Sequence, residues 1–244
     1  MLNICFVRLY FTPKYGILYI GDIMTEIYMV RHCEAMGNVK RLFQGSTDLD
    51  ISETGEKQLE YLKRRFANIP LDKVYTSPLI RAYKTALAVI GEKELTPIKY
   101  EGLREINGGI VEGRPFREAF AEIPGLADTW DNHPQDFAPE GGEPMRDAYS
   151  RIWNAVKEIA AANEGKTVAC TTHGGVMRCL LCRLLLGDIS RLAEMGWSDN
   201  TAVTLLRFGG EEMPEVVFYN DSSHLPPELI PKRSRLSSFI GDEK

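Results

Sequence analysis

The segment that decides the fold spans residues 26–38 and reads EIYMVRHCEAMGN. Its first half has the apolar character of a short buried strand, and this pattern stops abruptly at Arg31 and His32. Gly37 and the polar residues after it predict a turn, which would place the Arg31 side chain beside the His32 imidazole. In a continuing strand it would point to the opposite face. The sequence therefore predicts a histidine at the rim of a sheet, a position suited to chemistry.

Strand and helix patterns alternate along the rest of the chain. Further strands are predicted at residues 73–76, 98–100, 167–172, 202–208 and 216–219. Helices are predicted from Ser52 to before Pro70, from Ser77 and Pro78 to Gly91, at 116–122, at 144–162 and after Gly174. Ser77 is expected to cap its helix, with Pro78 in the first turn. This order is typical of a three-layer α/β/α fold, in which helices cover both faces of a mostly parallel sheet. Residues 108–142 are rich in glycine, proline and acidic residues and are predicted to be mainly loop.

Length and composition limit the classes of protein. With 244 residues, 44% hydrophobic and 26% charged, the chain is predicted to form one globular domain rather than a disordered segment. The formal net charge of -5 argues against non-specific binding to nucleic acid or to a membrane surface. An anionic substrate would therefore need a local cluster of cations.

The cysteines and the remaining histidines have no functional pattern. The five cysteines form no even disulfide framework, which predicts reduced thiols and a cytoplasmic protein. Cys179 and Cys182 have a CxxC spacing, but the apolar helix pattern around them favours core packing over redox chemistry. His133 and His224 follow no predicted strand end and are predicted to lie at the surface, and no ligand spacing indicates a metal site.

The two ends of the chain are predicted to lie outside the domain. Residues 1–23 are apolar and aromatic, yet Arg8, Pro13 and Gly16 interrupt them, so neither a membrane span nor a cleaved signal is expected. We interpret this stretch as an extension that precedes a natural start at Met24. Residues 24–225 are predicted to form a single domain. Residues 226–244, rich in proline and then basic, are predicted to be a loosely attached tail.

Two strand ends of the predicted sheet each deliver a histidine, His32 and His173. Arg81 follows a third strand end and Glu105 a fourth, and reactive groups in open α/β sheets collect beyond the carboxyl ends of the strands. The two glycines after the second histidine would let an anion approach the amides at the start of the next helix. Together with Arg31, this set suits phosphoryl transfer without a metal. Arginines bind the oxygens, a neutral histidine attacks phosphorus, and the carboxylate handles the leaving-group proton.

Five blocks of sequence occur in an order that matches one known family. They are RHCEAMGN at 31–38, FQG at 43–45, SPLIRAYKT at 77–85, LRE at 103–105 and THG at 172–174. Over residues 25–225 the chain thereby resembles the histidine phosphatase superfamily, in the branch of cofactor-dependent phosphoglycerate mutases and their phosphatase relatives. The resemblance implies that His32 is the phosphorylated nucleophile and that Glu105 is the general acid and later the base for water. It also implies roles for two further sets of residues: Arg31, Arg81 and His173 would hold the phosphoryl group, and Asn38, Gln44, Gly45 and Gly174 would line its pocket.

Cys33 departs from the family, which usually has glycine after its nucleophile. A side chain here could narrow the pocket or be accommodated, so it bears on substrate size and on activity. Its two positive neighbours also raise the hypothesis of a low-pKa thiol that rivals the histidine. The residues after it, 34–37, do not form the phosphate-cradling loop that a cysteine phosphatase needs, so the prediction stays with His32.

The leading prediction is a phosphomonoester hydrolase that acts through phosphohistidine on small phosphorylated metabolites and uses no cofactor. A mutase must retain a bisphosphorylated ligand, which calls for extra cations. The segment after Glu105 is instead acidic, with only Arg114 and Arg117 to oppose it. Hydrolysis is therefore favoured over a cofactor-dependent phosphoglycerate mutase. The alternative from another class is a catalytically silent phosphate-ester-binding or regulatory protein. The oligomeric state, including a homodimer, is left open.

Overall fold

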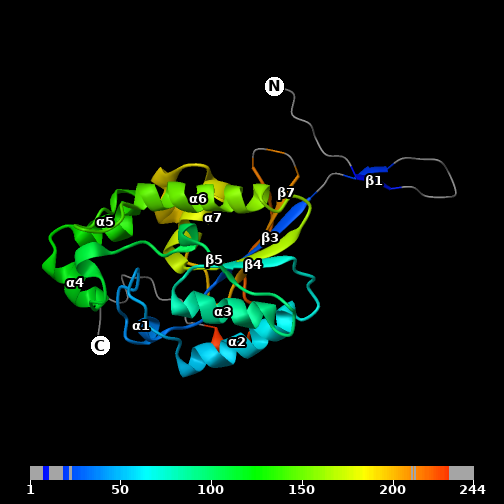
Figure 1. The fold of residues 1–244 in the computed structure, drawn as a ribbon. Coiled ribbons are helices and arrows are strands. Elements are labelled where there is room, and N and C mark those ends of the chain that lie inside the picture. The colour runs from blue at the N-terminus through cyan, green and yellow to red at the C-terminus, as the bar shows by residue number, and fades with distance from the viewer. Residues whose placement is uncertain (1–7, 11–18, 22–23, 210, 212, 231–244) are drawn as a thin grey trace.

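A six-stranded sheet forms the middle layer of the protein (Figure 1). The structure is a computed structural model, and it describes residues 8–10, 19–21, 24–209, 211 and 213–230. The strand order is β5-β4-β6-β3-β7-β8. The bounds are Thr25–Arg31 for β3, Lys73–Thr76 for β4, Ile98–Lys99 for β5, Thr167–Thr172 for β6, Val203–Phe208 for β7 and Glu215–Asp221 for β8. Two short strands, β1 (Arg8–Tyr10) and β2 (Tyr19–Gly21), pair antiparallel with each other.

The directions of the strands confirm the prediction of a mostly parallel sheet. β3 pairs in parallel with β6, β6 with β4, and β4 with β5. β7 runs antiparallel to both of its neighbours, β3 and β8. Because β3, β4 and β6 are parallel neighbours, their carboxyl ends meet at one edge of the sheet. His32, Ser77 and His173 directly follow these three strand ends.

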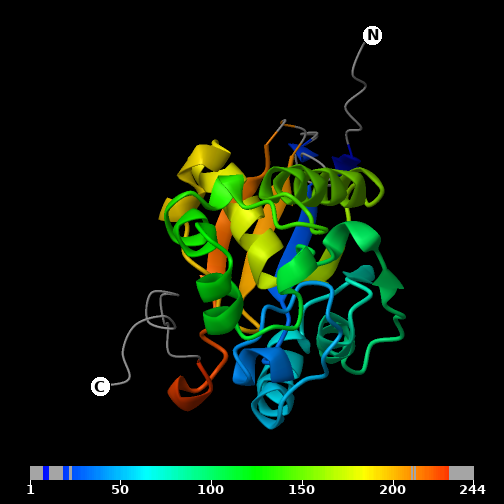
Figure 2. The ribbon, with the colours of Figure 1, turned by 90° about the vertical axis from the view of Figure 1, so that its left-hand side faces the viewer.

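Two pairs of helices cover the sheet (Figure 1 and Figure 2). The helices are α2 (Glu53–Phe66) and α3 (Ile80–Ile90) on one face, and α6 (Met145–Ala161) and α7 (Gly174–Leu186) on the other. Side chains of β3 alternate between the two layers, as the pleat requires. Ile27 and Met29 pack in the core formed with α6 and α7, whereas Val30 packs with α2 and α3. The predicted three-layer α/β/α architecture is confirmed.

The helix termini agree with the sequence pattern except at α3. The helix predicted to start at Ser52 is α2, and Ser52 caps it, since its side chain accepts a hydrogen bond from the amide of Gly55 at 3.0 Å. The prediction that Ser77 caps α3 is wrong, because the helix begins at Ile80 and Leu79 occupies the capping position. The hydroxyl of Ser77 instead contacts His173.

The middle of the chain contains more regular structure than predicted. Helix α4 (Phe116–Glu122) was expected, but α5 (Leu126–Asn132) was not. Three 3-10 turns lie at Glu101–Leu103, Gly109–Val111 and Pro134–Asp136. Trp130 of α5 packs against the rings of Phe43, Phe116, Phe120, Phe137 and Trp197. Tertiary packing stabilises α5, a helix of seven residues, and also anchors the loop that follows Phe43.

The described cysteines are packing residues. Cys33, Cys170, Cys179 and Cys182 are free and buried. Cys179 Sγ lies 3.4 Å from the sulfur of Met145, and Cys182 Sγ lies 3.2 Å from a backbone carbonyl. The interpretation of the CxxC spacing as core packing is confirmed.

The carboxyl-terminal end of the described chain packs against α2, whereas β1 lies away from the sheet layers (Figure 1). A short helix α1 (Met36–Val39) follows β3, and 3-10 turns lie at Ile189–Glu194 and Pro227–Leu229. Gln58 of α2 donates to the carbonyl of Leu229 at 2.9 Å, so the first residues of the predicted tail contact the domain. Most of residues 1–23 and all of 231–244 lie outside the described residues, and their assignment as extension and tail stays a prediction.

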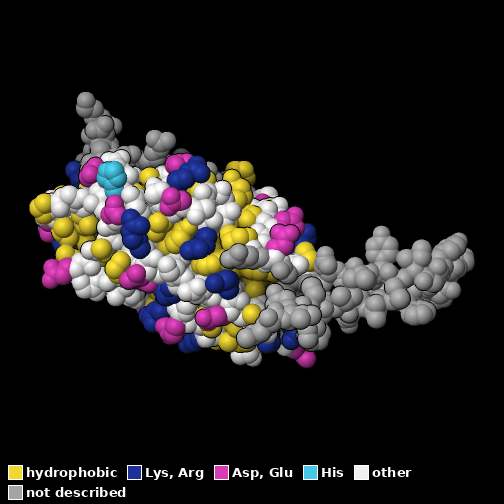
Figure 3. All heavy atoms as spheres, turned by 90° about the horizontal axis from the view of Figure 1, so that it is seen from above, with side chains coloured by type: hydrophobic (Ala, Val, Ile, Leu, Met, Phe, Trp, Pro, Cys, Tyr) yellow, Lys and Arg dark blue, Asp and Glu magenta, His cyan; other side chains and the backbone are white. Residues whose placement is uncertain are grey.

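The surface shows no large field of one charge on the face over α6. Basic, acidic and hydrophobic side chains are interspersed there (Figure 3). Within the part of the chain that the structure describes, no helix is long and apolar enough to cross a membrane.

Candidate active site

His32 lies directly after β3, where its backbone is held by neighbouring segments. Its amide donates to the carbonyl of Thr172 at 2.9 Å, and the side-chain amide of Asn200 donates to its carbonyl at 3.0 Å. The residue is 3% exposed, and Nδ1 of its ring lies 2.6 Å from the carbonyl oxygen of Cys33. A carbonyl only accepts, so Nδ1 carries the proton and donates. The lone pair on Nε2 is thereby left free to act as a nucleophile.

Two arginines supply unpaired donors around this histidine. The guanidinium of Arg81 donates to the carbonyls of Gln44, Gly45 and Thr47 at 2.8–3.1 Å, and it is fully buried. Arg31 donates through Nη1 to the carbonyl of Ser198. The Nε atoms of both arginines are buried and have no partner among the described residues. Buried charged donors without partners indicate a site that an anion completes.

The second histidine lies beside the first. The ring centroids of His32 and His173 are 5.1 Å apart. Burial first, and then the charges of Arg81 and Arg31, lower the pKa of both imidazoles well below the usual value. Both rings are therefore neutral at pH 7, as an attacking histidine must be.

Glu105 occupies the amino end of α7. Its carboxylate accepts hydrogen bonds from the amides of Gly175 at 2.8 Å, Val176 at 3.1 Å and Ile106 at 3.0 Å. A Cβ atom on Gly175 would lie 2.7 Å from Glu105 Oε1, and one on Gly174 would lie 3.1 Å from Arg31 Nε. The two glycines therefore let the carboxylate and the guanidinium approach the helix. The amides at the start of α7 were predicted to be open to a substrate anion. Two of them, those of Gly175 and Val176, donate to the Glu105 carboxylate instead.

The predicted pocket residues have structural contacts of their own. Gln44 accepts through Oε1 from the amide of Gly37 at 3.2 Å, and Asn38, which is exposed, accepts through Oδ1 from Ala35 at 2.9 Å. Gly45 is buried, and a Cβ there would overlap the carbonyl oxygen of Ile106. The structure thus explains these residues as loop-forming groups. Contact of Asn38, Gln44, Gly45 and Gly174 with substrate stays a prediction.

Sequence reasoning missed several supporting residues. Asn200 donates to the carbonyl of His32, and the carbonyl of Ser198 accepts from Arg31. The hydroxyl of Ser77 contacts His173. Asn200 and Ser198 precede β7, the antiparallel neighbour of β3, so their position before a late strand was the available signal. Glu112 accepts from the amides of Ser46, Thr47 and Gly108 and ties the loop that binds Arg81, but its acidic, loop-like surroundings gave no signal.

Cys33 packs against helices α2 and α3. Its side chain is fully buried, and its sulfur lies next to Gly55 of α2. A Cβ atom added to Gly55 would be 3.3 Å from this sulfur. Its amide donates to Thr85 Oγ1 of α3 at 3.1 Å. Burial raises the pKa of the thiol to about 12, so the hypothesis of a low-pKa nucleophile is wrong. Of the two consequences considered for the side chain, the structure shows accommodation between helices.

Replacing Cys33 by alanine is expected to affect stability rather than catalysis. Loss of a buried sulfur should lower the free energy of unfolding by about 1–2 kcal/mol. The value of kcat/KM should change by less than about threefold, because the thiol takes no part in the site. Urea unfolding and steady-state kinetics measure the two effects. A large loss of kcat/KM in a stably folded variant would contradict this assignment.

The neutral histidines predict a dependence of stability on pH. His32 and His173 have lower pKa values in the folded than in the unfolded state, so the unfolded chain takes up protons first as the pH falls. Their contribution is present above about pH 6.5 and is lost below it, at up to about 1.4 kcal/mol per pH unit for each ring. Burial also lowers the pKa of His224, to about 4, so this residue adds to the same loss of stability at low pH. The prediction that His224 lies at the surface is wrong, because the residue is half-buried. Urea unfolding between about pH 7 and 5 measures the slope.

A matched pair of variants isolates the buried rings. His133 is exposed as predicted, so His133→Asn should leave the slope unchanged. His173→Asn should flatten it. Equal slopes for the two variants would contradict the prediction.

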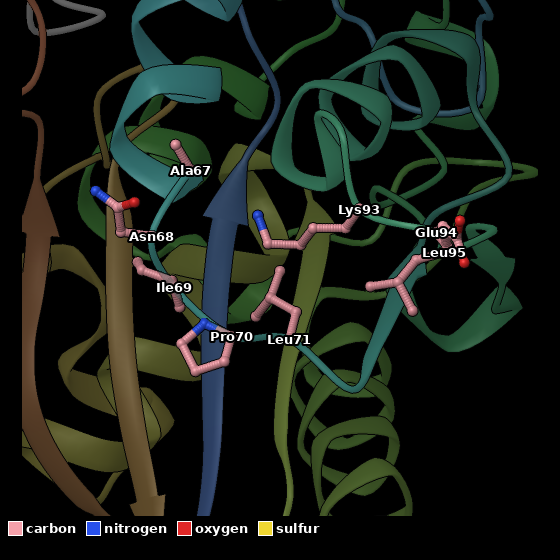
Figure 4. A pocket seen from close by; sticks show the side chains of 8 residues that line it. All are labelled: Ala67, Asn68, Ile69, Pro70, Leu71, Lys93, Glu94 and Leu95. Carbon is pink, nitrogen blue, oxygen red and sulfur yellow. The ribbon is translucent and has the colours of Figure 1, made fainter.

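A hollow of about 350 Å³ lies at the opposite edge of the sheet, before β4 and β5 begin (Figure 4). It is lined by Ala67, Asn68, Ile69, Pro70, Leu71, Lys93, Glu94 and Leu95. The ammonium of Lys93 donates to the carbonyl of Phe66 at 2.7 Å, so this cation already has a partner. The hollow has none of the groups that the histidine site gathers.

Comparisons with known proteins agree with this site. The model of the histidine phosphatase superfamily (branch 1) matches residues 27–222. Phosphoserine phosphatase 1 of Hydrogenobacter thermophilus is 32% identical over 203 residues, which cover 83% of this chain and 95% of that protein. A metal-independent phosphoserine phosphatase of Arabidopsis thaliana is 29% identical over 225 residues, covering 91% and 90%. The solved structure of Bacillus stearothermophilus YhfR superposes with a TM-score of 0.78 at 32% identity, and covers 82% of this chain and 98% of that one. The chain therefore belongs to branch 1 of the histidine phosphatase superfamily.

Proposed function

We propose that this enzyme hydrolyses phosphomonoesters of small hydroxy or amino acids through a phosphohistidine on His32, with phosphoserine as the first candidate substrate. It is a phosphatase of the histidine type that acts on small phosphorylated metabolites, in keeping with its family and its relatives. One observation carries the proposal. A neutral imidazole with a free Nε2 stands beside two buried arginine Nε donors that have no partner among the described residues.

In the first step, Arg31, Arg81 and His173 hold the oxygens of the phosphoryl group. Nε2 of His32 attacks phosphorus, the P–O bond to the leaving group breaks, and Glu105 gives its proton to the departing oxygen. In the second step, Glu105 takes a proton from water, and the water oxygen attacks phosphorus. The P–N bond breaks, which releases orthophosphate and restores the neutral imidazole. The arginines balance the charge of the transferring group in both steps.

Hydrolysis is favoured over mutase action by the ion pairing of three arginines between residues 104 and 151. Arg104 pairs with Glu101 at 3.0 Å, Arg114 pairs with Glu122, and Arg151 pairs with Glu143 at 2.7 Å. Each of these cations is therefore paired with a carboxylate close to it in the sequence. A second phosphate group on a retained bisphosphate would have to compete with them.

The remaining expectations belong to the same proposal. The partner is a small phosphorylated substrate, no cofactor takes part, and nucleic acid and membrane surfaces are not partners. The compartment is the cytoplasm, in keeping with the four free thiols among the described residues. A homodimer remains one option for the assembly.

A panel of phosphomonoesters tests the activity. It includes phosphoserine and 3-phosphoglycerate, the latter with and without its bisphosphate, and each reaction is assayed for released phosphate and for isomerised product. Release of phosphate from phosphoserine is the expected result. Isomerisation faster than release would favour the mutase, and no turnover of any ester would favour the silent binding protein.

A further inference from the structure

Ser77 forms a buried contact with the second histidine of the site. Its hydroxyl oxygen lies 2.7 Å from Nε2 of His173, and both residues are fully buried. Nδ1 on the other side of the ring is buried and has no partner among the described residues. One nitrogen of this imidazole is therefore committed to the protein, and the other is left for a ligand.

The backbone fixes this contact. Ser77 follows β4 and His173 follows β6, and the amide of Ser77 donates to the carbonyl of Thr171 at 2.9 Å. The parallel pairing of the two strands thus brings the hydroxyl beside the imidazole. A contact set by strand register keeps its geometry without help from a mobile loop.

The surroundings of the hydroxyl favour one direction of the hydrogen bond between Ser77 and His173. Ser77 Oγ accepts, at 3.4 Å, from the amide of Leu79, and the carbonyl of Ser77 is taken by the hydroxyl of Thr76 at 2.9 Å. Within the described chain, Nε2 of His173 is the acceptor that its proton can reach. We propose that Ser77 is a positioning residue that donates its hydroxyl proton to Nε2 of His173 and thereby holds the imidazole in the tautomer protonated on Nδ1.

This tautomer makes His173 a donor toward the phosphoryl group. If Nε2 carried the proton instead, the lone pair on Nδ1 would face the phosphoryl oxygens and repel them. His32 has the same tautomer but uses it in the opposite way, since its Nδ1 proton goes to Cys33 and its Nε2 lone pair stays free. The two rings thus become nucleophile and donor through the hydrogen bond that each makes to the protein. The functional part of this inference rests on the proposed phosphatase activity.

Nitrogen NMR of the resting enzyme reads the tautomer directly. The chain has four histidines, so a uniformly ¹⁵N-labelled sample gives few ring signals, and the His173→Asn variant assigns those of His173. Protonated and bare ring nitrogens differ widely in chemical shift. The expected result is a protonated Nδ1 and a bare Nε2 in the unmodified enzyme.

Removing the hydroxyl should release the tautomer. In Ser77→Ala we expect the His173 signals to move toward the Nε2-protonated form, which imidazole side chains favour in water. Orthophosphate should bind about tenfold more weakly, because the ring no longer presents a fixed donor. Ser77→Thr keeps a hydroxyl and should keep both the tautomer and the orthophosphate affinity. If the threonine methyl is not tolerated, Ser77→Cys serves in its place, and its weaker donor should give values between those of the unmodified enzyme and Ser77→Ala.

Thr25→Ala is the matched control, since it also removes a buried hydroxyl, but at the amino end of β3. It should leave the shifts of His173 and the orthophosphate affinity unchanged.

Two outcomes overturn the inference. One is a His173 protonated on Nε2 in the unmodified enzyme, and the other is a folded Ser77→Ala variant whose His173 shifts are unaltered. Neither depends on turnover. If the shifts behave as expected but no phosphomonoester is hydrolysed, the proposed activity fails and the tautomer assignment stands.

Discussion

The His32→Ala variant is expected to lose turnover by on the order of 10⁵-fold and to form no phosphoenzyme. In the proposed mechanism the free Nε2 of His32 is the atom that bonds to phosphorus, and the variant has no nucleophile in its place. Arg31 and Arg81 keep their unpaired donors, so orthophosphate should still bind. Rapid quenching with radiolabelled substrate measures acid-labile, base-stable label on the protein, and calorimetry measures orthophosphate binding.

The control for this experiment is an exposed histidine. His133→Ala removes the same side chain from the surface and should retain both turnover and label. Label that persists in His32→Ala, or that moves to Cys33, would contradict the assigned nucleophile. Loss of orthophosphate binding together with turnover would show that the variant had lost the pocket and not only the attacking atom.

The Glu105→Gln variant is expected to discriminate between leaving groups. An ester with an alkoxide leaving group, such as phosphoserine, needs a proton from the general acid, and its turnover should fall by about 10²–10⁴-fold. The nitrophenolate of 4-nitrophenyl phosphate leaves without a proton, so phosphorylation of His32 should remain fast. Hydrolysis of the phosphoenzyme still needs a base for water. We therefore expect a burst of nitrophenolate followed by a slow steady state in rapid-mixing measurements.

The contacts of Glu105 demand a stability control. Both carboxylate oxygens accept backbone amides, so the NH₂ group of a glutamine must face one of these donors. Asp72→Asn controls for the loss of a carboxylate charge alone, because a single oxygen of Asp72 accepts a backbone amide, that of Thr167 at 2.8 Å, and the amide oxygen of asparagine can keep this contact. It should leave the leaving-group dependence unchanged. Equal losses for the two esters and no burst in Glu105→Gln would argue against the general acid.

The parts of the fold that the sequence predicts are those with long or simple periodicity. The bounds of β4 and β6 agree with their apolar runs, and Ser52 caps α2 because its helix pattern begins directly after it. Helix α4 also has only seven residues and was predicted, whereas α5, of the same length, was not, and α5 depends on the rings around Trp130. Such a helix is set by tertiary packing, which a local pattern does not contain.

For the active site, the sequence located the groups but not their partners. Strand ends placed His32, His173 and Arg81 correctly at one edge, because parallel strands end together. Local turn chemistry predicted that Ser77 caps a helix. In the structure its hydroxyl instead contacts the imidazole of His173, which follows the neighbouring strand β6. The direction of the Cys33 side chain depends on a gap beside α2, and no pattern in the nearby residues encodes it.

The sheet order has a consequence for how the protein is made. Asn200, which holds the backbone of His32, lies 168 residues further along the chain, and Ser198, which holds Arg31, lies 167 residues beyond its partner. Contacts so distant in sequence form slowly, because the intervening chain must be ordered before they add stability. During synthesis His32 leaves the ribosome long before β7 does. A nascent chain that stops before Ser198 therefore has the residues around His32 and the contact of His32 with β6, but it lacks the contacts from Ser198 and Asn200.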